Sequence, residues 1–155
     1  MRRLAAELGV APTAIYWHVG NRNELLDALV DQLIAELGDP APVGDTPGAR
    51  VAWIARWIRA QVSARPHLIG LAHEQGRSGE VFFSAQAALA KQLGDAGVDD
   101  VTAALAVRAV VFYAGGFILL EHSLQEQPSR LATRPELDEV FEFSLKALLR
   151  AIIPG

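Results

Sequence analysis

The sequence predicts an all-α protein, and three observations support this fold class. None of its 155 residues lie in a run that alternates apolar and polar side chains, the pattern of a half-buried strand. Several segments instead repeat apolar side chains at i, i+3, i+4 and i+7, the spacing of an amphipathic helix. Glycine and proline divide the chain into pieces of helical length. With 51% hydrophobic and 21% charged residues, a disordered or low-complexity protein is excluded.

Two short helices are predicted at the start of the chain. Gly9 ends the first, over residues 2–8, because glycine suits the left-handed position that follows a helix. Pro12 begins the second, which runs to Val19. Proline is favoured in a first turn because its fixed φ fits there and its missing N–H is not needed.

A third helix and a linker follow. Asn21 and Glu24 have the spacing of a capping box, and the helix that they begin ends at Gly38. The next ten residues, DPAPVGDTPG, contain three prolines and form the only clear linker. We therefore divide the chain into a head, residues 1–38, and a body, residues 48–155.

The body is predicted to contain five helices. The first begins at Pro47, behind a capping Thr46, and the second begins at Pro66 and ends near Gly76. The other three are expected over residues 80–93, over a long apolar segment that follows Asp100 and includes 103–120, and over 135–153.

The segment 103–120, AALAVRAVVFYAGGFILL, is apolar on every face. Its length is at the lower limit for crossing a membrane, but Arg108 would cost about 2.5–3.5 kcal/mol at the membrane centre. Amphipathic helices on both sides can cover it. We therefore expect the buried helix of a soluble bundle, with no membrane partner. Because one subunit cannot cover all of its faces, we also expect a homodimer through residues 101–125 and 135–153.

Composition and motifs exclude several functional classes. The chain has no cysteine, which excludes disulfides, thiolate metal sites and thiol nucleophiles. The four histidines are scattered, and no nucleophile–base pattern or phosphate-binding loop is present. The first residues do not resemble a secretory signal. We expect a cytoplasmic protein that is not an enzyme and has no cofactor and no metal.

The two short helices joined at Gly9 form a helix-turn-helix pattern. If Ile15 faces inward, Trp17 points almost directly away from the core, because successive helical residues rotate by about 100°. An exposed tryptophan is unusual unless something binds it. The alternative is that Tyr16 and Trp17 pack on a neighbouring helix or a partner subunit. Side chains able to reach phosphates or base edges surround Trp17, and the candidate DNA-binding residues are Arg2, Arg3, Thr13, Tyr16, Trp17, His18 and Arg22.

The stretch RRLAAELGVAPTAIYWHVGNRNELLDAL resembles the DNA-binding head of TetR-type transcriptional repressors, in particular the tetracycline-repressor branch with its YWHV element. The match covers residues 1 to about 37, and beyond residue 48 only the helical architecture is similar. The resemblance implies a repressor that a small-molecule effector releases from its DNA operator, with a body that dimerises through its last long helices. It also implies that the helix from Pro12 to Val19 enters the major groove. The implied roles are base-edge contacts for Arg2 and Thr13, backbone contacts for Tyr16, His18 and Arg22, and bracing on the duplex for Trp17.

The family's head has three helices, and this chain begins at the second. Either residues precede Met1 in the natural protein, or the protein is short and its head is altered. Residues 1–30 carry three arginines and three acidic side chains, so a neutral head offers little attraction to phosphate. The alternative function is a helical dimer that binds a small hydrophobic ligand or a protein partner without DNA. Without a first helix, we expect partial exposure of Leu4, Ile15, Val19 and Leu25.

A ligand site in a helical bundle is a mostly apolar cavity with a few polar groups. Arg108 and Tyr113 interrupt an apolar helix, and a buried arginine needs either an acidic partner or an anionic ligand. For the tryptophans, core packing is the alternative. The polar residues that tetracycline-binding members place ahead of this region have no match here, so we do not expect tetracycline as the effector. The candidate effector-binding residues are Trp57, Gln61, His67, Gln86, Arg108, Phe112, Tyr113 and Phe117.

Overall fold

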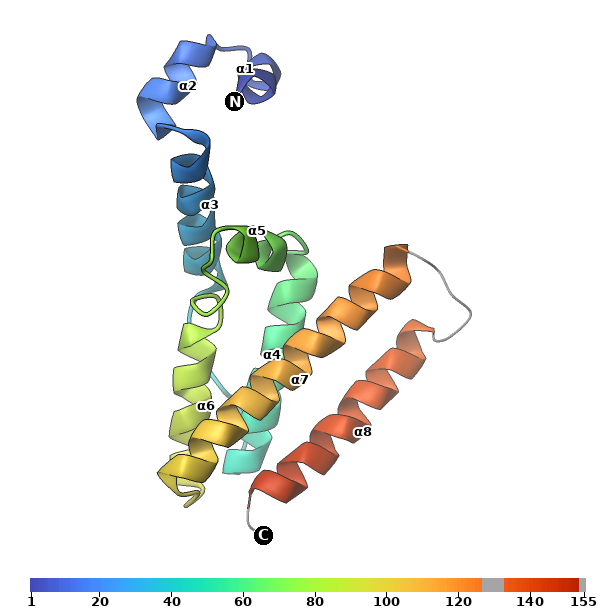
Figure 1. The fold of residues 1–155 in the computed structure, drawn as a ribbon. Helices are drawn as coiled ribbons and strands as arrows, with labels where there is room; N and C mark the ends of the chain where they lie inside the picture. The colour runs from blue at the N-terminus through green and yellow to red at the C-terminus, as the bar shows by residue number, and fades with distance from the viewer. Residues whose placement is uncertain (127–132, 154–155) are drawn as a thin grey trace. The chain divides into compact units, whose positions relative to one another are not determined.

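The computed structural model of the protein describes residues 1–126 and 133–153, except for the side chains of residues 122–126 and 134. The described residues form eight α-helices and no strand (Figure 1), which confirms the all-α prediction. The chain divides into two compact units. Unit 1 comprises Met1–Gly38 and His67–Val81, and unit 2 comprises Asp39–Pro66 and Phe82–Gly155. Unit 1 therefore contains the predicted head, residues 1–38, together with His67–Val81, which lies within the predicted body.

Unit 1 contains the two short helices predicted at the start of the chain. Gly9 ends the first of them with φ 64° and ψ 28°, the left-handed conformation expected there. The second begins at Pro12 and ends before Gly20. The helices of this unit are α1 (Arg2–Leu8), α2 (Pro12–Val19), α3 (Arg22–Leu37) and α5 (Leu68–Glu74).

The predicted capping box is present at the start of α3. The Asn21 side chain accepts hydrogen bonds from the backbone N–H groups of Asn23, at 2.9 Å, and Glu24, at 3.1 Å. The Glu24 carboxylate accepts in return from the Asn21 N–H, at 3.1 Å. Gly20, at φ 68°, leaves room for this arrangement, since a Cβ there would lie 1.5 Å from a Glu24 carboxylate oxygen.

Replacing Asn21 by alanine is expected to lower the free energy of unfolding by about 1 kcal/mol, because two N–H groups of the first turn lose their acceptor. Urea unfolding followed by circular dichroism measures the change. The matched control is Gln32→Ala, an exposed position in the middle of α3 whose side chain bonds only to Glu36 at 2.8 Å among the interactions described. That variant should change stability by less than about 0.5 kcal/mol. Equal losses in the two variants would contradict the capping role.

The apolar side chains of α1 and α2 close only a small core. Ala5 and Ile15 are buried, whereas Leu8 and Val10 are exposed, so the expected partial exposure of Ile15 is wrong. Partial exposure is confirmed for Leu4, Val19 and Leu25, which are half-buried. A cavity of about 340 Å³ opens here, lined by Leu4, Leu8, Val10, Ala14, Ile15, His18, Val19 and Leu25.

Unit 2 is a bundle built around α4, which packs against the three other helices of the unit. Its helices are α4 (Pro47–Ala64), α6 (Phe83–Asp95), α7 (Asp100–Glu126) and α8 (Arg134–Ile152). Thr46 caps α4 by accepting from the Ala49 N–H at 3.1 Å, as predicted. The fully buried side chains repeat with helical spacing and include Val51, Ile54, Ile58, Val62, Leu89, Leu93, Val110, Phe141 and Leu145.

Two predicted helix starts differ from the structure. The helix expected from residue 80 begins at Phe83, because Arg77 and Glu80 form a turn in which the Glu80 N–H bonds to the Arg77 carbonyl at 3.0 Å. The helix expected from Pro66 begins at Leu68. Both differences amount to two or three residues at a terminus, where boundaries are least determined by the sequence.

Candidate nucleic-acid interface and effector region

The α2 surface carries four of the seven predicted DNA-binding side chains, and the three arginines lie on α1 and at the start of α3. Trp17 is 89% exposed, and Ile15 on the opposite side of the helix is buried, so the predicted outward orientation of the indole is confirmed. The alternative that Trp17 packs on a neighbouring helix does not hold within this chain. All seven candidates are exposed, namely Arg2, Arg3, Thr13, Tyr16, Trp17, His18 and Arg22. Their contacts with DNA stay a prediction.

Arg22 has a partner that the sequence did not indicate. Its Nη2 atom lies 2.8 Å from Oε1 of Glu74, the last residue of α5. Both side chains are about half exposed. The pair joins positions 52 residues apart in the chain, so it follows from the packing of α5 against α3 and from no local pattern.

A second arginine holds the segment after α5 to α3. Arg77 donates from Nη2 to Asp31 Oδ1 at 2.6 Å and from Nη1 to the Asp27 carbonyl at 3.1 Å. It also binds Glu80, and this hydrogen bond holds the pKa of the Glu80 carboxyl below its usual value. Unit 1 contains four arginines and seven acidic side chains, a net charge of −3, so its positive charges are local.

In unit 2, an aromatic cluster brings together two of the candidate effector-binding residues. Tyr113 stacks on Phe141 with ring centroids 5.2 Å apart, and Phe117 meets the same ring edge-on, also at 5.2 Å. The Tyr113 hydroxyl donates to the Phe141 carbonyl at 2.7 Å, and burial raises the pKa of this hydroxyl. Tyr113 and Phe117 therefore contribute to the core between α7 and α8.

The buried arginine of unit 2 is Arg59 and not Arg108. Arg59 is 13% exposed and Glu121 4% exposed, and Arg59 donates from both Nε, at 3.1 Å, and Nη2 to the Glu121 carboxylate. Nη2 also lies 2.6 Å from Asp138 Oδ1. The hydrogen bond with Glu121 is the main reason that the pKa of Arg59 is raised. The expected burial of Arg108 is wrong, since that side chain is exposed on α7.

Arg59 also completes the aromatic cluster. Its guanidinium carbon lies 4.6 Å from the centroid of the Phe141 ring and 5.1 Å from that of Phe117. A guanidinium over an aromatic face is attracted by the ring quadrupole. One arginine of α4 therefore binds an acidic residue of α7, an acidic residue of α8 and two aromatic rings.

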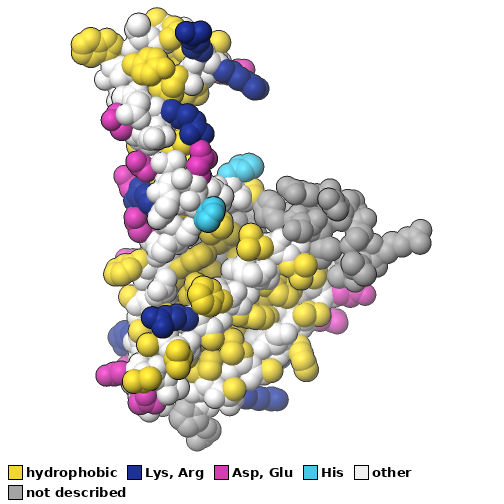
Figure 2. Space-filling model, in the orientation of Figure 1, with side chains coloured by type: hydrophobic (Ala, Val, Ile, Leu, Met, Phe, Trp, Pro, Cys, Tyr) yellow, Lys and Arg dark blue, Asp and Glu magenta, His cyan; other side chains and the backbone are white. Residues whose placement is uncertain are grey.

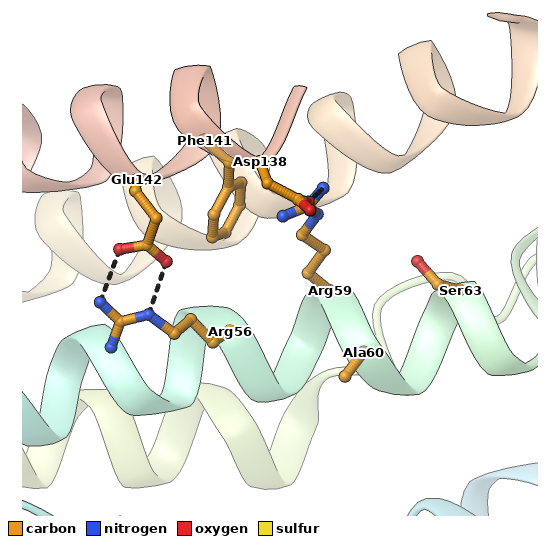
Figure 3. A pocket seen from close by; sticks show the side chains of 7 residues that line it. All are labelled: Arg56, Arg59, Ala60, Ser63, Asp138, Phe141 and Glu142. Atoms are coloured by element: carbon orange, nitrogen blue, oxygen red, sulfur yellow. Dashed lines mark hydrogen bonds and ion pairs between the residues drawn. The ribbon is translucent and has the colours of Figure 1, made fainter. Parts of the chain in front are cut away.

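A cavity of about 290 Å³ opens between α4 and α8 beside this cluster (Figure 3). At one end, Arg56 and Glu142 form a two-pronged ion pair with both distances 2.7 Å, which holds the pKa of Glu142 below its usual value. Ala60 and Ser63 lie toward the other end. None of the eight predicted effector-binding residues lines the cavity, which is lined by Arg56, Arg59, Ala60, Ser63, Asp138, Phe141 and Glu142.

The other predicted effector-binding residues are not gathered at this cavity. Trp57, Gln61 and Gln86 are half-buried, and the Gln61 side chain accepts from Arg65 at 2.7 Å. His67 is exposed and belongs to unit 1. Phe112 lies with Arg108 on the exposed side of α7. Their role in effector binding stays a prediction.

An apolar surface follows the exposed sides of α7 and α8, and we name it the α7–α8 apolar face. Figure 2 shows hydrophobic side chains gathered over these helices. By length and composition alone α7 qualifies as a membrane span over Asp100–Glu121, with mean hydropathy 2.0, yet only 39% of its apolar window is buried. The exposed members of the face are Val101, Leu105, Phe112, Leu119, Leu120, Val140 and Phe143.

Within residues 1–126 and 133–153, histidine, aspartate and glutamate side chains form no group of three or more that could hold a metal ion. Ion pairs of arginine with carboxylates are present in both units, among them Arg59–Glu121 and Arg77–Asp31.

The chain is similar in part of its sequence to a known repressor and in its fold to several solved structures. No protein-family model matches it. It is 51% identical over 35 residues to the class A tetracycline repressor protein from transposon 1721 of Escherichia coli, a match that covers 23% of this chain and 16% of that repressor.

Solved structures match almost the whole chain. A TetR variant from Acinetobacter baumannii AYE in complex with minocycline is 25% identical, with a TM-score of 0.69 over 97% of this chain and 82% of that chain. BioQ with its double-stranded DNA operator is 28% identical, with a TM-score of 0.61 over 97% of this chain and 83% of that chain. The fold, the helix-turn-helix sequence and these matches agree, and the chain is similar to TetR-type repressors in the sequence of its head and to TetR and BioQ in its whole fold.

Proposed function

We propose that the protein is a DNA-binding transcriptional repressor that a small-molecule effector releases from its operator. The observation that carries the proposal is the α2 surface, where the exposed Trp17 stands among polar side chains on the second helix of the helix-turn-helix. The structure of BioQ with an operator supports the proposal, as does the sequence match with a tetracycline repressor. In this function the protein works in the cytoplasm and is not an enzyme.

The proposed docking places α2 in the major groove. Arg2 and Thr13 would contact base edges, and Tyr16, His18 and Arg22 would contact the DNA backbone. A dimer would insert two such helices into successive major grooves, about 34–36 Å apart. The phosphate contacts would position the head, whereas the base contacts would select the sequence.

Dimerisation is proposed to occur through the α7–α8 apolar face. The face exposes two phenylalanines, Phe112 and Phe143, which a soluble monomer rarely leaves in water. A second copy of the chain could cover it by forming a four-helix contact from two helices per subunit. Arg108 lies on the same side of α7 and would be costly in the centre of a membrane, which favours a protein partner.

The effector is proposed to bind in unit 2, beside the aromatic cluster. The cavity between α4 and α8 reaches Phe141, which touches both Tyr113 and Phe117 of the predicted set. A ligand that binds one arrangement of α4 and α8 better than another shifts the balance between them. If those arrangements space the two heads differently, effector binding and DNA binding oppose each other. The minocycline complex of the Acinetobacter baumannii protein supports a ligand-binding body.

A second candidate function is a helical dimer that binds a hydrophobic ligand or a protein without DNA. Two observations favour it. Unit 1 has a net charge of −3, and its α1–α2 region contains an open apolar cavity of about 340 Å³. A negatively charged head gains little from counterion release.

Binding to a fluorescently labelled duplex of about 21 base pairs, two helical turns, separates the two candidates. For the repressor, the affinity should fall steeply between about 50 and about 200 mM salt, and Trp17 fluorescence should change on binding. Arg22→Ala should weaken binding and reduce the slope of log affinity against log salt by about 0.9 per head. Trp17→Phe is the control for the fluorescence signal, since Trp53 and Trp57 remain. A salt-independent affinity that Arg22→Ala leaves unchanged would favour the second candidate.

A further inference from the structure

We propose that Glu74 is an internal competitor that holds Arg22 away from DNA phosphate and so lowers the affinity of the protein for DNA. This inference rests on the proposed function, because Arg22 affects DNA binding only if unit 1 binds DNA. Its basis is the ion pair between Arg22 Nη2 and Glu74 Oε1, 2.8 Å apart. The pair joins the first residue of α3 to the last residue of α5, two helices that pack together in unit 1 (Figure 1).

Arg22 stands where a phosphate contact is needed. Only Gly20 and Asn21 separate it from the end of α2, the helix proposed to enter the groove. The backbone N–H groups of Asn23 and Glu24 are bound to the Asn21 side chain, and the Glu24 carboxylate binds the Asn21 N–H. Because the capping box occupies these donors, the Arg22 guanidinium is the strong donor left at this helix terminus.

Glu74 and a phosphate compete for the same group. A carboxylate and a phosphate both present oxygen atoms that match the guanidinium fork. Arg22 must therefore loosen its bond to Glu74 before it can bind a phosphate fully, and the Glu74 charge also repels the DNA backbone. Both effects weaken DNA binding, and both are absent once Glu74 is neutral.

The position of Glu74 is fixed by contacts other than the ion pair. Leu68 and Ala72 of α5 are fully buried, and Arg77 ties the following segment to Asp27 and Asp31 of α3. Replacing the Glu74 carboxylate should therefore leave α5 in place and release Arg22 alone. Any state of α5 that withdraws Glu74 would have the same effect, which makes this pair a point where DNA affinity can be regulated.

The test compares the wild-type protein with Glu74→Gln by titration with the labelled duplex at about 50 mM salt. We expect Glu74→Gln to bind about 2- to 5-fold more tightly per head, the range set by the usual strength of an exposed ion pair. For a dimer that engages both heads, the factor is squared. The gain should shrink as salt rises, because salt also screens the Arg22–Glu74 pair.

Two further variants make the test specific. Glu36→Gln removes the same charge near the other end of α3, about 21 Å from Arg22 along the helix, and should change the affinity little. In an Arg22→Ala background, Glu74→Gln should tighten binding clearly less than in the wild-type background, because the competition for Arg22 is gone and only the repulsion between Glu74 and DNA is removed. Equal affinities of wild type and Glu74→Gln, or an equally large gain in the Arg22→Ala background, would overturn the inference and leave the proposed function standing. If neither protein binds the duplex at low salt, the proposed function fails and the inference fails with it.

Discussion

Arg59→Ala is expected to lower the free energy of unfolding by about 3–5 kcal/mol, the usual cost of breaking a buried ion pair by removing one partner. The Glu121 carboxylate is only 4% exposed and receives hydrogen bonds from two nitrogen atoms of Arg59. Without the guanidinium, this buried charge loses two hydrogen bonds that help to offset its removal from water. The stacking of Arg59 on Phe141 and Phe117 is lost as well. Urea unfolding at neutral pH measures the effect.

Arg56→Ala is the matched control for this substitution. Arg56 lies one turn earlier on α4 and forms an ion pair of similar geometry with Glu142, but those two side chains are 46% and 36% exposed. An exposed pair contributes at most about 1 kcal/mol, so this variant should be nearly as stable as wild type. A third variant, Arg59→Met with Glu121→Leu, removes both buried charges and should recover most of the lost stability. If Arg59→Ala lowers the free energy of unfolding no more than Arg56→Ala does, the buried pair does not contribute more to stability than the exposed pair, and the prediction is wrong.

The local features of unit 1 could be predicted because neighbouring residues determine them. The left-handed turn at Gly9 needs a residue without a Cβ, and the capping box at Asn21 and Glu24 needs two side chains three positions apart. The outward position of Trp17 followed from helical rotation once Ile15 was placed inside. Each of these arguments spans less than two turns of helix, over which the geometry of an α-helix is nearly fixed.

The ion pairs between distant parts of the chain could not be predicted, because they depend on which segments pack together. Arg59 and Glu121 are 62 residues apart, and no pattern in the chain connects them. The prediction that Arg108 is buried in α7 is wrong for a related reason. Apolar residues surround this helix on every side, so no buried face can be assigned from the pattern, and the structure places Arg108 on the exposed face. The burial of Arg59 could not be predicted, because an arginine beside the apolar residues of an amphipathic helix usually lies on the solvated side of that helix.

Either Phe112→Asp or Phe143→Asp is expected to convert the dimer into a monomer, and this is the second large effect that we predict. Phe112 on α7 is 75% exposed and Phe143 on α8 is 76% exposed in the single chain, and both belong to the α7–α8 apolar face. A two-fold interface contains each residue twice, and a buried phenylalanine contributes about 1.5–3 kcal/mol. Each substitution should therefore weaken dimerisation about 10²- to 10⁴-fold, before the cost of burying the new carboxylate is counted.

Phe83→Asp provides the control that separates this interface from a general effect of removing exposed phenylalanine. Phe83 is 74% exposed, nearly the same as the two test positions, but it begins α6 and lies outside the α7–α8 apolar face. Light scattering or sedimentation at micromolar concentration should find a dimer for wild type and Phe83→Asp, and a monomer for the other two variants. Circular dichroism should show unchanged helix content in all three variants, because each replaced side chain is exposed in the single chain. A monomeric wild type, or a Phe83→Asp variant that dissociates as readily as Phe112→Asp, would show that the α7–α8 apolar face does not join two copies of this chain.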